Sequence, residues 1–390
     1  MSTIIEDTNN NITNEKSNSE TKKQEKKIKK RITDDDLYRH SSQYRFWSFT
    51  EDSLKEKRIE INENATVKVK ELLANFIESK KDTLSERELQ AIQSKATPLT
   101  YEEELKLVGF YAKKVQVIAQ HLNLPTEVVA TSITFFKRFY LENSVMEYDP
   151  KDMVHTTIFL ACKSENYFIS VESFSNKAKS KKEEILKYEF KLLESLKFTL
   201  LNHHPYKPLH GFFLDIQHVL HGKVDLNYMG KIYDKSKRRI TDALLTDAVY
   251  HFTPPQITLA VFLIEDEQLI RKYLELKFSV PAAEPTTTAI PEPSKEPSDS
   301  NKTDASADEK KVEPENRNKI NVEKLLDIIT RCKMMIESFE TISTQDAKLI
   351  YAKNYYCKNP NVIVQKLKRK LEEPSADNGS DEHIDKKQST

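Results

Sequence analysis

TEVVATSITFFKRFYL, at residues 126–141, is the stretch that decides the fold class. Its large apolar residues recur at steps of three and four, which places them on one face of a helix. They are Val129, Ile133, Phe136 and Tyr140. Pro125 stands just before the first turn, where its fixed φ suits a helix start. The stretch therefore predicts a helix that buries one side against its neighbours.

Similar helical patterns continue on both sides of this stretch. Before it, an apolar stripe runs through residues 101–122, and after it the start signal Asp149-Pro150 opens another helix. Further helices are expected at 171–178, 181–198, 209–220, 228–250, 256–265 and 325–336. Because short links join these segments, we expect an all-α protein with one helical domain at residues 100–202 and a second at 203–345.

Helical segments are expected on both flanks of the two domains, at residues 38–99 and 346–371. Thr50 can cap a helix that starts at Glu51. The aromatic cluster before it, which contains Trp47, is interpreted as an anchor that packs the N-terminal helix, rather than as a cage for a ligand.

Three stretches have a composition that does not support a packed core. They are a basic tail at 1–37, a proline-bearing insertion at about 280–317 and a polar tail at 372–390, all of which we expect to be disordered. The run KKQEKKIKKR at residues 22–31 is either a nuclear import signal or a solvated tail.

The composition excludes several classes of function. Lys plus Arg equals Asp plus Glu at 61 each, so net charge gives no attraction to nucleic acid or to a membrane, and no run of about 18 apolar residues exists. The five glycines form no phosphate-binding loop, and the three cysteines have no metal-ligand spacing. We therefore expect no catalytic residues, no cofactor, no metal and no membrane association.

Glu189 is out of place in the helix expected at 181–198. At 100° per residue it falls in the apolar arc, between Ile185 and Leu192. A carboxylate that faces a core costs several kcal/mol unless it has a partner. That partner is either internal, such as Lys163, or another polypeptide.

Several long segments, in order, resemble the cyclin box. They are SITFFKRFYLENSVMEYDP at 132–150, FLACKSENYF at 159–168 and the helix with Tyr188 and Glu189. The cyclin H family is the nearer match, because it also shows relatives of residues 38–49, 204–216 and 244–262. The resemblance implies two tandem cyclin folds of about five helices each, with flanking N- and C-terminal helices.

The resemblance also implies a non-catalytic function in the nucleus. Members of this family bind and activate the cyclin-dependent kinase of transcription factor TFIIH, which phosphorylates the C-terminal domain of RNA polymerase II. The implied partners are that kinase, a RING-finger assembly factor and other TFIIH subunits, with no direct contact to nucleic acid. The resemblance implies that five residues contact the kinase, namely Lys163, Glu165, Glu189, Leu193 and Phe198.

One alternative class uses the same fold. The basal transcription factor TFIIB has cyclin folds that bind DNA, since a fold alone does not fix function. Such a protein needs a basic face, and here the clearest basic runs lie in the tails, at 22–31 and 366–370. The sequence therefore favours the kinase-binding interpretation.

Overall fold

The protein is described from a computed structural model, which covers residues 34–279 and 321–372. The basic run at 22–31, the insertion expected at 280–317 and nearly all of both expected tails fall outside these residues. Helix α1 (Asp34–His40) begins within the stretch that the sequence assigned to the tail. Its last turn carries Arg39 and His40, an arrangement that suits the helix dipole.

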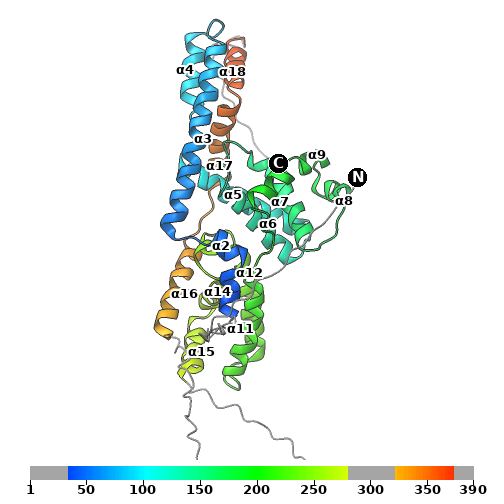
Figure 1. Cartoon of the computed structure of the whole chain (residues 1–390), viewed down its shortest axis with the longest axis vertical. Coiled ribbons are helices and arrows are strands. Elements are labelled where there is room, and N and C mark those ends of the chain that lie inside the picture. The colour runs from blue at the N-terminus through cyan, green and yellow to red at the C-terminus, as the bar shows by residue number, and fades with distance from the viewer. Residues whose placement is uncertain (1–33, 280–320, 373–390) are drawn as a thin grey trace, which may run out of the picture. The chain divides into compact units, whose positions relative to one another are not determined.

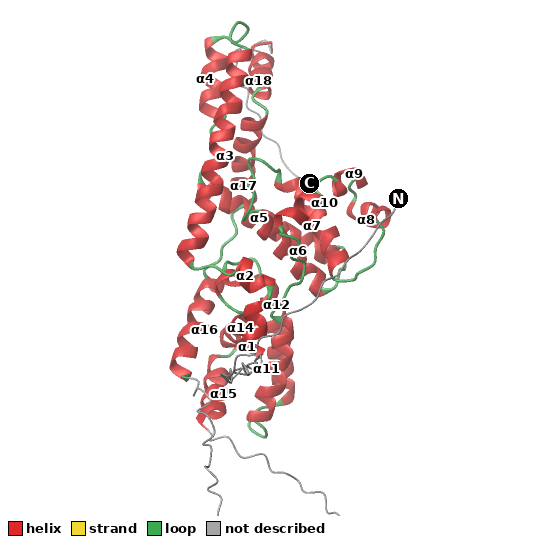
Figure 2. Cartoon of the chain, in the orientation of Figure 1, coloured by secondary structure: helices red, strands yellow, loops and turns green. Residues whose placement is uncertain are grey.

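The described residues contain helices and loops without a strand, as the sequence predicted (Figure 2). The N-terminal flank consists of α2 (Ser42–Trp47), α3 (Glu51–Ser79) and α4 (Glu86–Lys95). The cap expected at Thr50 is present, because its hydroxyl accepts a hydrogen bond from the Ser53 N–H at 3.2 Å. Ser85 and Glu88 form a similar capping box at the start of α4.

The first fold is built around α6 (Thr126–Phe139), whose residues are almost all buried. It packs against α5 (Tyr101–His121) and α7 (Pro150–Ser164), as Figure 1 shows. The cap of α7 follows the sequence signal, since Asp149 accepts a hydrogen bond from the Lys151 N–H at 2.9 Å. The fold is completed by α8 (Val171–Ala178), α9 (Lys182–Leu186) and α10 (Glu189–Ser195).

The second fold is built around the apolar helix α14 (Pro254–Glu265). Around it lie α11 (Tyr206–Val219), α12 (Leu226–Ala243), α13 (Ala248–His251), α15 (Glu267–Ser279) and α16 (Val322–Glu337). The single helix expected at 228–250 is wrong, because the chain turns after Ala243 and resumes as α13. Lys137 of α6 explains the turn, since its ammonium group binds the carbonyl oxygens of Leu244 and Thr246.

The C-terminal flank returns to the first fold through α17 (Thr344–Lys358) and α18 (Asn361–Glu372). The Tyr351 hydroxyl donates to Asp149 at 2.6 Å, and the Asn354 amide donates to the carbonyl of Val145 at 3.0 Å. Helix α18 packs along α4 (Figure 1). Helices of the two flanks, far apart in sequence, thus pack together beside the first fold.

A polar clamp joins the N-terminal flank to both folds. Arg58 of α3 donates two hydrogen bonds of 2.7 Å to the carboxylate of Asp247, which lies between α12 and α13. The ammonium nitrogen of Lys137 lies 4.0 Å from the same carboxylate. Burial lowers the pKa of Lys137 to about 7, although the negative charge of Asp247 opposes that shift.

Candidate binding surface

Lys163 and Glu189 form an ion pair on the first fold. Lys163 ends α7 and Glu189 begins α10, and the Lys163 ammonium donates to Glu189 Oε1 at 2.5 Å. The lysine nitrogen also lies 4.5 Å from the centre of the Phe159 ring. The side chains are 48% and 21% exposed, so both charged groups remain accessible from solvent. An exposed pair of this kind contributes about 0–1 kcal/mol to stability.

The expectation that Glu189 faces the core is wrong, and so is the single helix at 181–198. A turn at Lys187 and Tyr188 separates α9 from α10. Tyr188 packs its ring edge-on against Tyr148, with 5.7 Å between the ring centres. This turn moves Glu189 to the edge of the apolar arc, while Ile185 and Leu192 stay buried. Within this chain the partner of Glu189 is internal, namely Lys163.

An aromatic pair extends the surface beside Glu189. Phe198 is 64% exposed, and its ring centre lies 6.5 Å from that of Phe190, which is 72% exposed. Leu193 is half-buried and packs partly on the core. The sequence reasoning missed Phe190, although an aromatic side chain on the polar face of α10 was a readable signal. We define the α10 surface as Lys163, Glu189, Phe190, Leu193 and Phe198.

An unusual turn presents Phe198. Lys197 and Phe198 both have φ of 54°, a left-handed conformation that costs a non-glycine residue about 1–2 kcal/mol. The Phe198 N–H donates to the carbonyl of Leu193 at 3.0 Å, and the Lys197 N–H donates to that of Glu194 at 2.8 Å. These bonds satisfy carbonyl groups at the end of α10 and turn the Phe198 side chain outward.

The N-terminal flank supports this turn. The indole N–H of Trp47 donates to the hydroxyl of Thr199 at 3.0 Å, and the Lys197 ammonium lies 5.2 Å from the Trp47 ring. Lys197 also pairs with Glu142 at 3.1 Å, and Lys57 of α3 pairs with the same carboxylate at 3.0 Å. Trp47 is 1% exposed, which confirms that it is a packing anchor.

Glu165 lies apart from the α10 surface. It is the residue that follows the last turn of α7, and its Oε1 accepts a hydrogen bond from Thr131 at 2.6 Å. The Thr131 oxygen lies 2.7 Å from Nε2 of His204. Because the only hydroxyl proton goes to Glu165, Thr131 accepts the Nε2–H of His204. Burial, with the charge of Arg138 second, lowers the pKa of His204 to about 3, so its ring is neutral.

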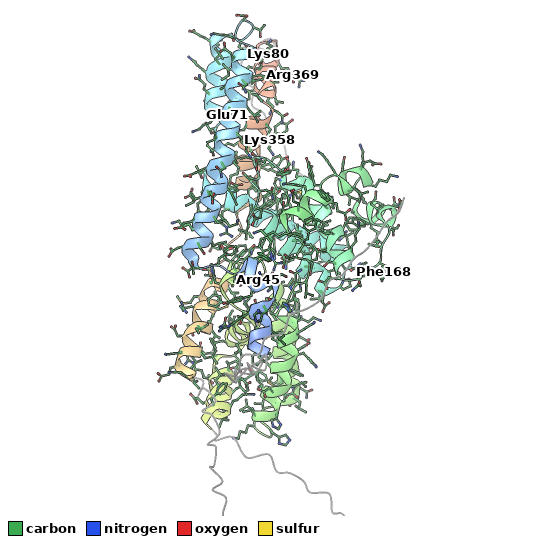
Figure 3. The ribbon with its side chains drawn as sticks, in the orientation of Figure 1. Arg45, Glu71, Lys80, Phe168, Lys358 and Arg369 are labelled. Atoms are coloured by element: carbon green, nitrogen blue, oxygen red, sulfur yellow. The ribbon has the colours of Figure 1, made fainter. Side chains whose placement is uncertain are left out.

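A cavity of about 330 Å³ opens next to Glu165, lined also by Leu200, Leu201 and Tyr206. Leu201 is 69% exposed, and Phe168, labelled in Figure 3, is 95% exposed. Leu200 and Leu201 thus place apolar side chains beside Glu165. Glu165 belongs to the network between α6, α7 and the link to the second fold.

Two further kinds of site were looked for among the described residues, a metal centre and a membrane span. Among them no group of three His, Cys, Asp or Glu side chains is placed to hold a metal ion. No helix in this part of the chain is long and apolar enough to cross a bilayer. What the first fold does offer is an exposed ion pair beside exposed aromatic rings, which is the composition of a protein-binding surface.

Two tandem helical folds of this kind are typical of cyclins, and comparison with known families agrees. The model of the cyclin N-terminal domain matches residues 80–201, and that of the cyclin C-terminal domain matches residues 204–337. The chain belongs to the cyclin family and, within it, to the cyclin H group.

Individual relatives support this assignment. Cyclin CCL1 of Saccharomyces cerevisiae is 58% identical over 93% of this chain and 90% of its own length. Cyclin-H of Xenopus laevis is 31% identical over 58% of this chain and 68% of its own. A chain in the solved yeast TFIIK (Kin28/Ccl1/Tfb3) complex is 56% identical with a TM-score of 0.55, covering 77% of this chain and all of that one.

A second solved structure agrees in fold. A chain of the CAK complex from Chaetomium thermophilum, bound to ATP-gamma-S, is 26% identical with a TM-score of 0.65, and the match covers 90% of this chain and all of that one. Both matches therefore cover the whole length of the solved chain.

Proposed function

We propose that this chain is the regulatory subunit that binds and activates a cyclin-dependent kinase of the TFIIH type. The observation that carries the proposal is the 56% identity to a chain of the solved yeast TFIIK (Kin28/Ccl1/Tfb3) complex. In this role the chain supports phosphorylation of the C-terminal domain of RNA polymerase II in the nucleus. Its further partners are a RING-finger assembly factor and other TFIIH subunits, and it supplies no catalytic group.

The α10 surface is the proposed kinase contact, and Glu165, which lies apart from it, is proposed as a separate contact with the same kinase. The pair of Lys163 and Glu189 offers both a donor and an acceptor at fixed positions, since the two side chains hold each other at 2.5 Å. The pair contributes little to the fold while it is solvated. Once a partner desolvates it, the same pair fixes the register of the interface.

Activation then follows from a shift of conformational population. A cyclin-dependent kinase needs its mobile helix in place to align its catalytic lysine and glutamate. A rigid helical surface that binds only the aligned state stabilises that state by the difference in binding free energy. Phe190 and Phe198 supply the apolar area for such binding, and the charged pair supplies specificity.

Co-purification with the kinase is the direct test of the proposed function. The full chain is expected to remain bound to a TFIIH-type kinase through size-exclusion chromatography, and to raise its activity on a peptide from the RNA polymerase II tail. A chain that binds no cyclin-dependent kinase would overturn the proposal.

Glu189→Ala tests the proposed contact. We expect weaker kinase binding and activation, with helicity and melting nearly unchanged, because the lost pair is exposed. Glu194→Ala is a matched control on the same helix, since Glu194 pairs with Lys191 at 2.9 Å and is also exposed. A large loss of stability with unchanged kinase affinity would mean that Glu189 serves the fold alone.

A further inference from the structure

Three lysines from separate helices gather at the other end of α7. Lys114 lies on α5, Lys151 lies in the first turn of α7, and Lys348 lies on α17. All three are exposed. We call Lys114, Lys151 and Lys348 the lysine cluster. It is assembled only when the C-terminal flank packs on the first fold, so sequence reasoning had no means to find it.

Aromatic rings hold two of these lysines in place. The Lys114 nitrogen lies 4.8 Å from the centre of the Phe110 ring and 5.0 Å from that of Tyr111. The Lys151 nitrogen lies 3.7 Å from the centre of the Tyr351 ring, and the Tyr111 and Tyr351 rings are 6.4 Å apart. A ring face attracts an ammonium group but leaves its N–H groups free to bind an anion.

No carboxylate in the described residues forms a direct ion pair with the cluster. In the described part of the chain, no carboxylate oxygen lies within 4.0 Å of the ammonium nitrogen of any of the three lysines. Burial lowers the pKa of Lys114, and the positive charges of Lys151 and Lys348 lower it further, so both of these groups repel the Lys114 ammonium group. An anion bound among them would relieve that repulsion.

Asp149 lies beside this arrangement, where each of its carboxylate oxygens accepts a hydrogen bond while the group keeps its negative charge. It accepts the Tyr351 hydroxyl at 2.6 Å and the backbone N–H of Lys151 at 2.9 Å. Two other acidic residues, Asp152 on α7 and Asp346 on α17, limit the area of the surface that is positively charged. The positive area is therefore compact, whereas a nucleic-acid backbone is bound by an extended basic stripe.

We propose that the lysine cluster binds a phosphorylated serine or threonine in a peptide segment of a partner protein. A phosphoryl group carries about −1.5 to −2 charge and three acceptor oxygens, which match several converging ammonium groups. The partly exposed Phe110 ring and the 52% exposed side chain of Val117 offer apolar contact for residues beside the phosphate.

The two proposed surfaces can be occupied at once. Lys151 and Lys163 are twelve residues apart on α7, which corresponds to about 18 Å along the helix. The cluster can therefore be tested on the purified full chain, without a kinase. Failure of phosphopeptide binding would leave the proposed kinase contact untouched, and failure of kinase binding would leave the cluster untouched.

Fluorescence anisotropy with the full chain tests the proposal. The probe is a short labelled Gly-Ser peptide with two phosphoserines, compared with the same peptide without phosphate. We expect the phosphorylated peptide to bind at least about tenfold more tightly. A triple change of Lys114, Lys151 and Lys348 to Gln is expected to abolish that preference.

A matched triple variant controls for net charge. Lys70, Lys95 and Lys223 are exposed and have no ion pair in the described residues, so changing them to Gln removes the same charge elsewhere. Lys348→Glu is a second variant that touches no ring, and it is expected to weaken binding while melting stays unchanged. Equal phosphopeptide binding by the two triple variants would overturn the proposal, as would equally tight binding of a single-stranded DNA of the same charge.

Discussion

At the level of single residues, a few backbone positions with positive φ carry conformational strain. In the described residues, Asn123, Asn166, Lys179, Lys197 and Phe198 are the non-glycine residues with positive φ. Asparagine adopts this conformation at low cost, whereas lysine and phenylalanine do not. Lys179 ends α8, where glycine is the usual residue.

Lys179→Gly is expected to raise the free energy of unfolding by about 1 kcal/mol, because Lys179 has φ of 51° at the end of α8 and glycine adopts this conformation without strain. Lys177→Gly, two residues earlier in the same helix, is the control and is expected to lower it by about 1 kcal/mol. Urea unfolding followed by circular dichroism measures both. Equal changes in the two variants would contradict the assignment of strain to Lys179.

Phe198→Ala is expected to weaken kinase binding by about 2 kcal/mol, because buried aromatic residues dominate interface energetics. Its melting temperature should barely change, since the side chain is 64% exposed in the free chain. Leu349→Ala, on α17 and 70% exposed, is the matched control. Calorimetric titration with the kinase measures the difference, and equal affinities for the two variants would remove Phe198 from the interface.

The sequence predicted residue roles well where the cause is local and poorly where it is not. Thr50 and Asp149 cap helices as expected, because a cap depends on the next three residues. The prediction of one uninterrupted helix at 181–198 places Glu189 in the core. Tyr188 interrupts it through contact with Tyr148, forty residues earlier in the chain, and no periodicity within 181–198 contains that contact.

At the level of elements, helix existence was predictable and helix ends were less so. The stripes at 101–122, 126–141 and 171–178 became α5, α6 and α8. The helix expected at 228–250 failed because Lys137, from the other fold, binds carbonyl groups at 244 and 246. Polar contacts between distant elements thus decide where an apolar pattern stops being helical.

The short element α2 also acts at a distance, through the turn that presents Phe198. Deleting residues 1–50 removes Trp47, and loss of a buried tryptophan costs about 3–5 kcal/mol. We therefore expect a lower melting temperature and weaker kinase activation. Unchanged activation would exclude any contribution of this segment to the α10 surface.

Trp47→Phe separates the hydrogen bond from the packing. It keeps an aromatic ring but removes the donor to Thr199, which is 3.0 Å away. We expect stability to fall by about 1–2 kcal/mol and kinase affinity to fall with it, because the turn at 197–198 loses a support. Arg45→Ala, which changes an exposed residue of the same helix, should alter neither stability nor kinase affinity. A kinase affinity equal to that of the unchanged chain would show that the turn at 197–198 does not need the hydrogen bond from Trp47.

For the whole molecule, the clamp of Arg58 and Asp247 connects the N-terminal flank to the second fold. Lys137 connects the first fold to the same clamp. Burial alone would raise the pKa of Asp247, but the hydrogen bonds from Arg58 and the nearby positive charges outweigh it and lower the pKa to about 2. A folded-state pKa below the unfolded value near 3.8 means that the clamp stabilises the fold above pH 4. Its contribution, about 2 kcal/mol, is lost as the pH falls toward 2.

Asp247→Asn is expected to lower the free energy of unfolding at pH 7 by about 3–5 kcal/mol, because the Arg58 side chain, only 13% exposed, loses its charged partner. The deficit should narrow as the pH falls from 4 toward 2, since the unchanged chain then protonates Asp247 and loses the same interaction. Asp242→Asn is the control, because Asp242 meets Lys113 at 3.0 Å with 59% of its side chain exposed and should cost at most about 1 kcal/mol. Urea titrations across this pH range measure all three chains. A deficit for Asp247→Asn that stays constant from pH 7 to pH 2 would mean that the two folds are held together by apolar packing, with the clamp contributing geometry but no pH-dependent stability.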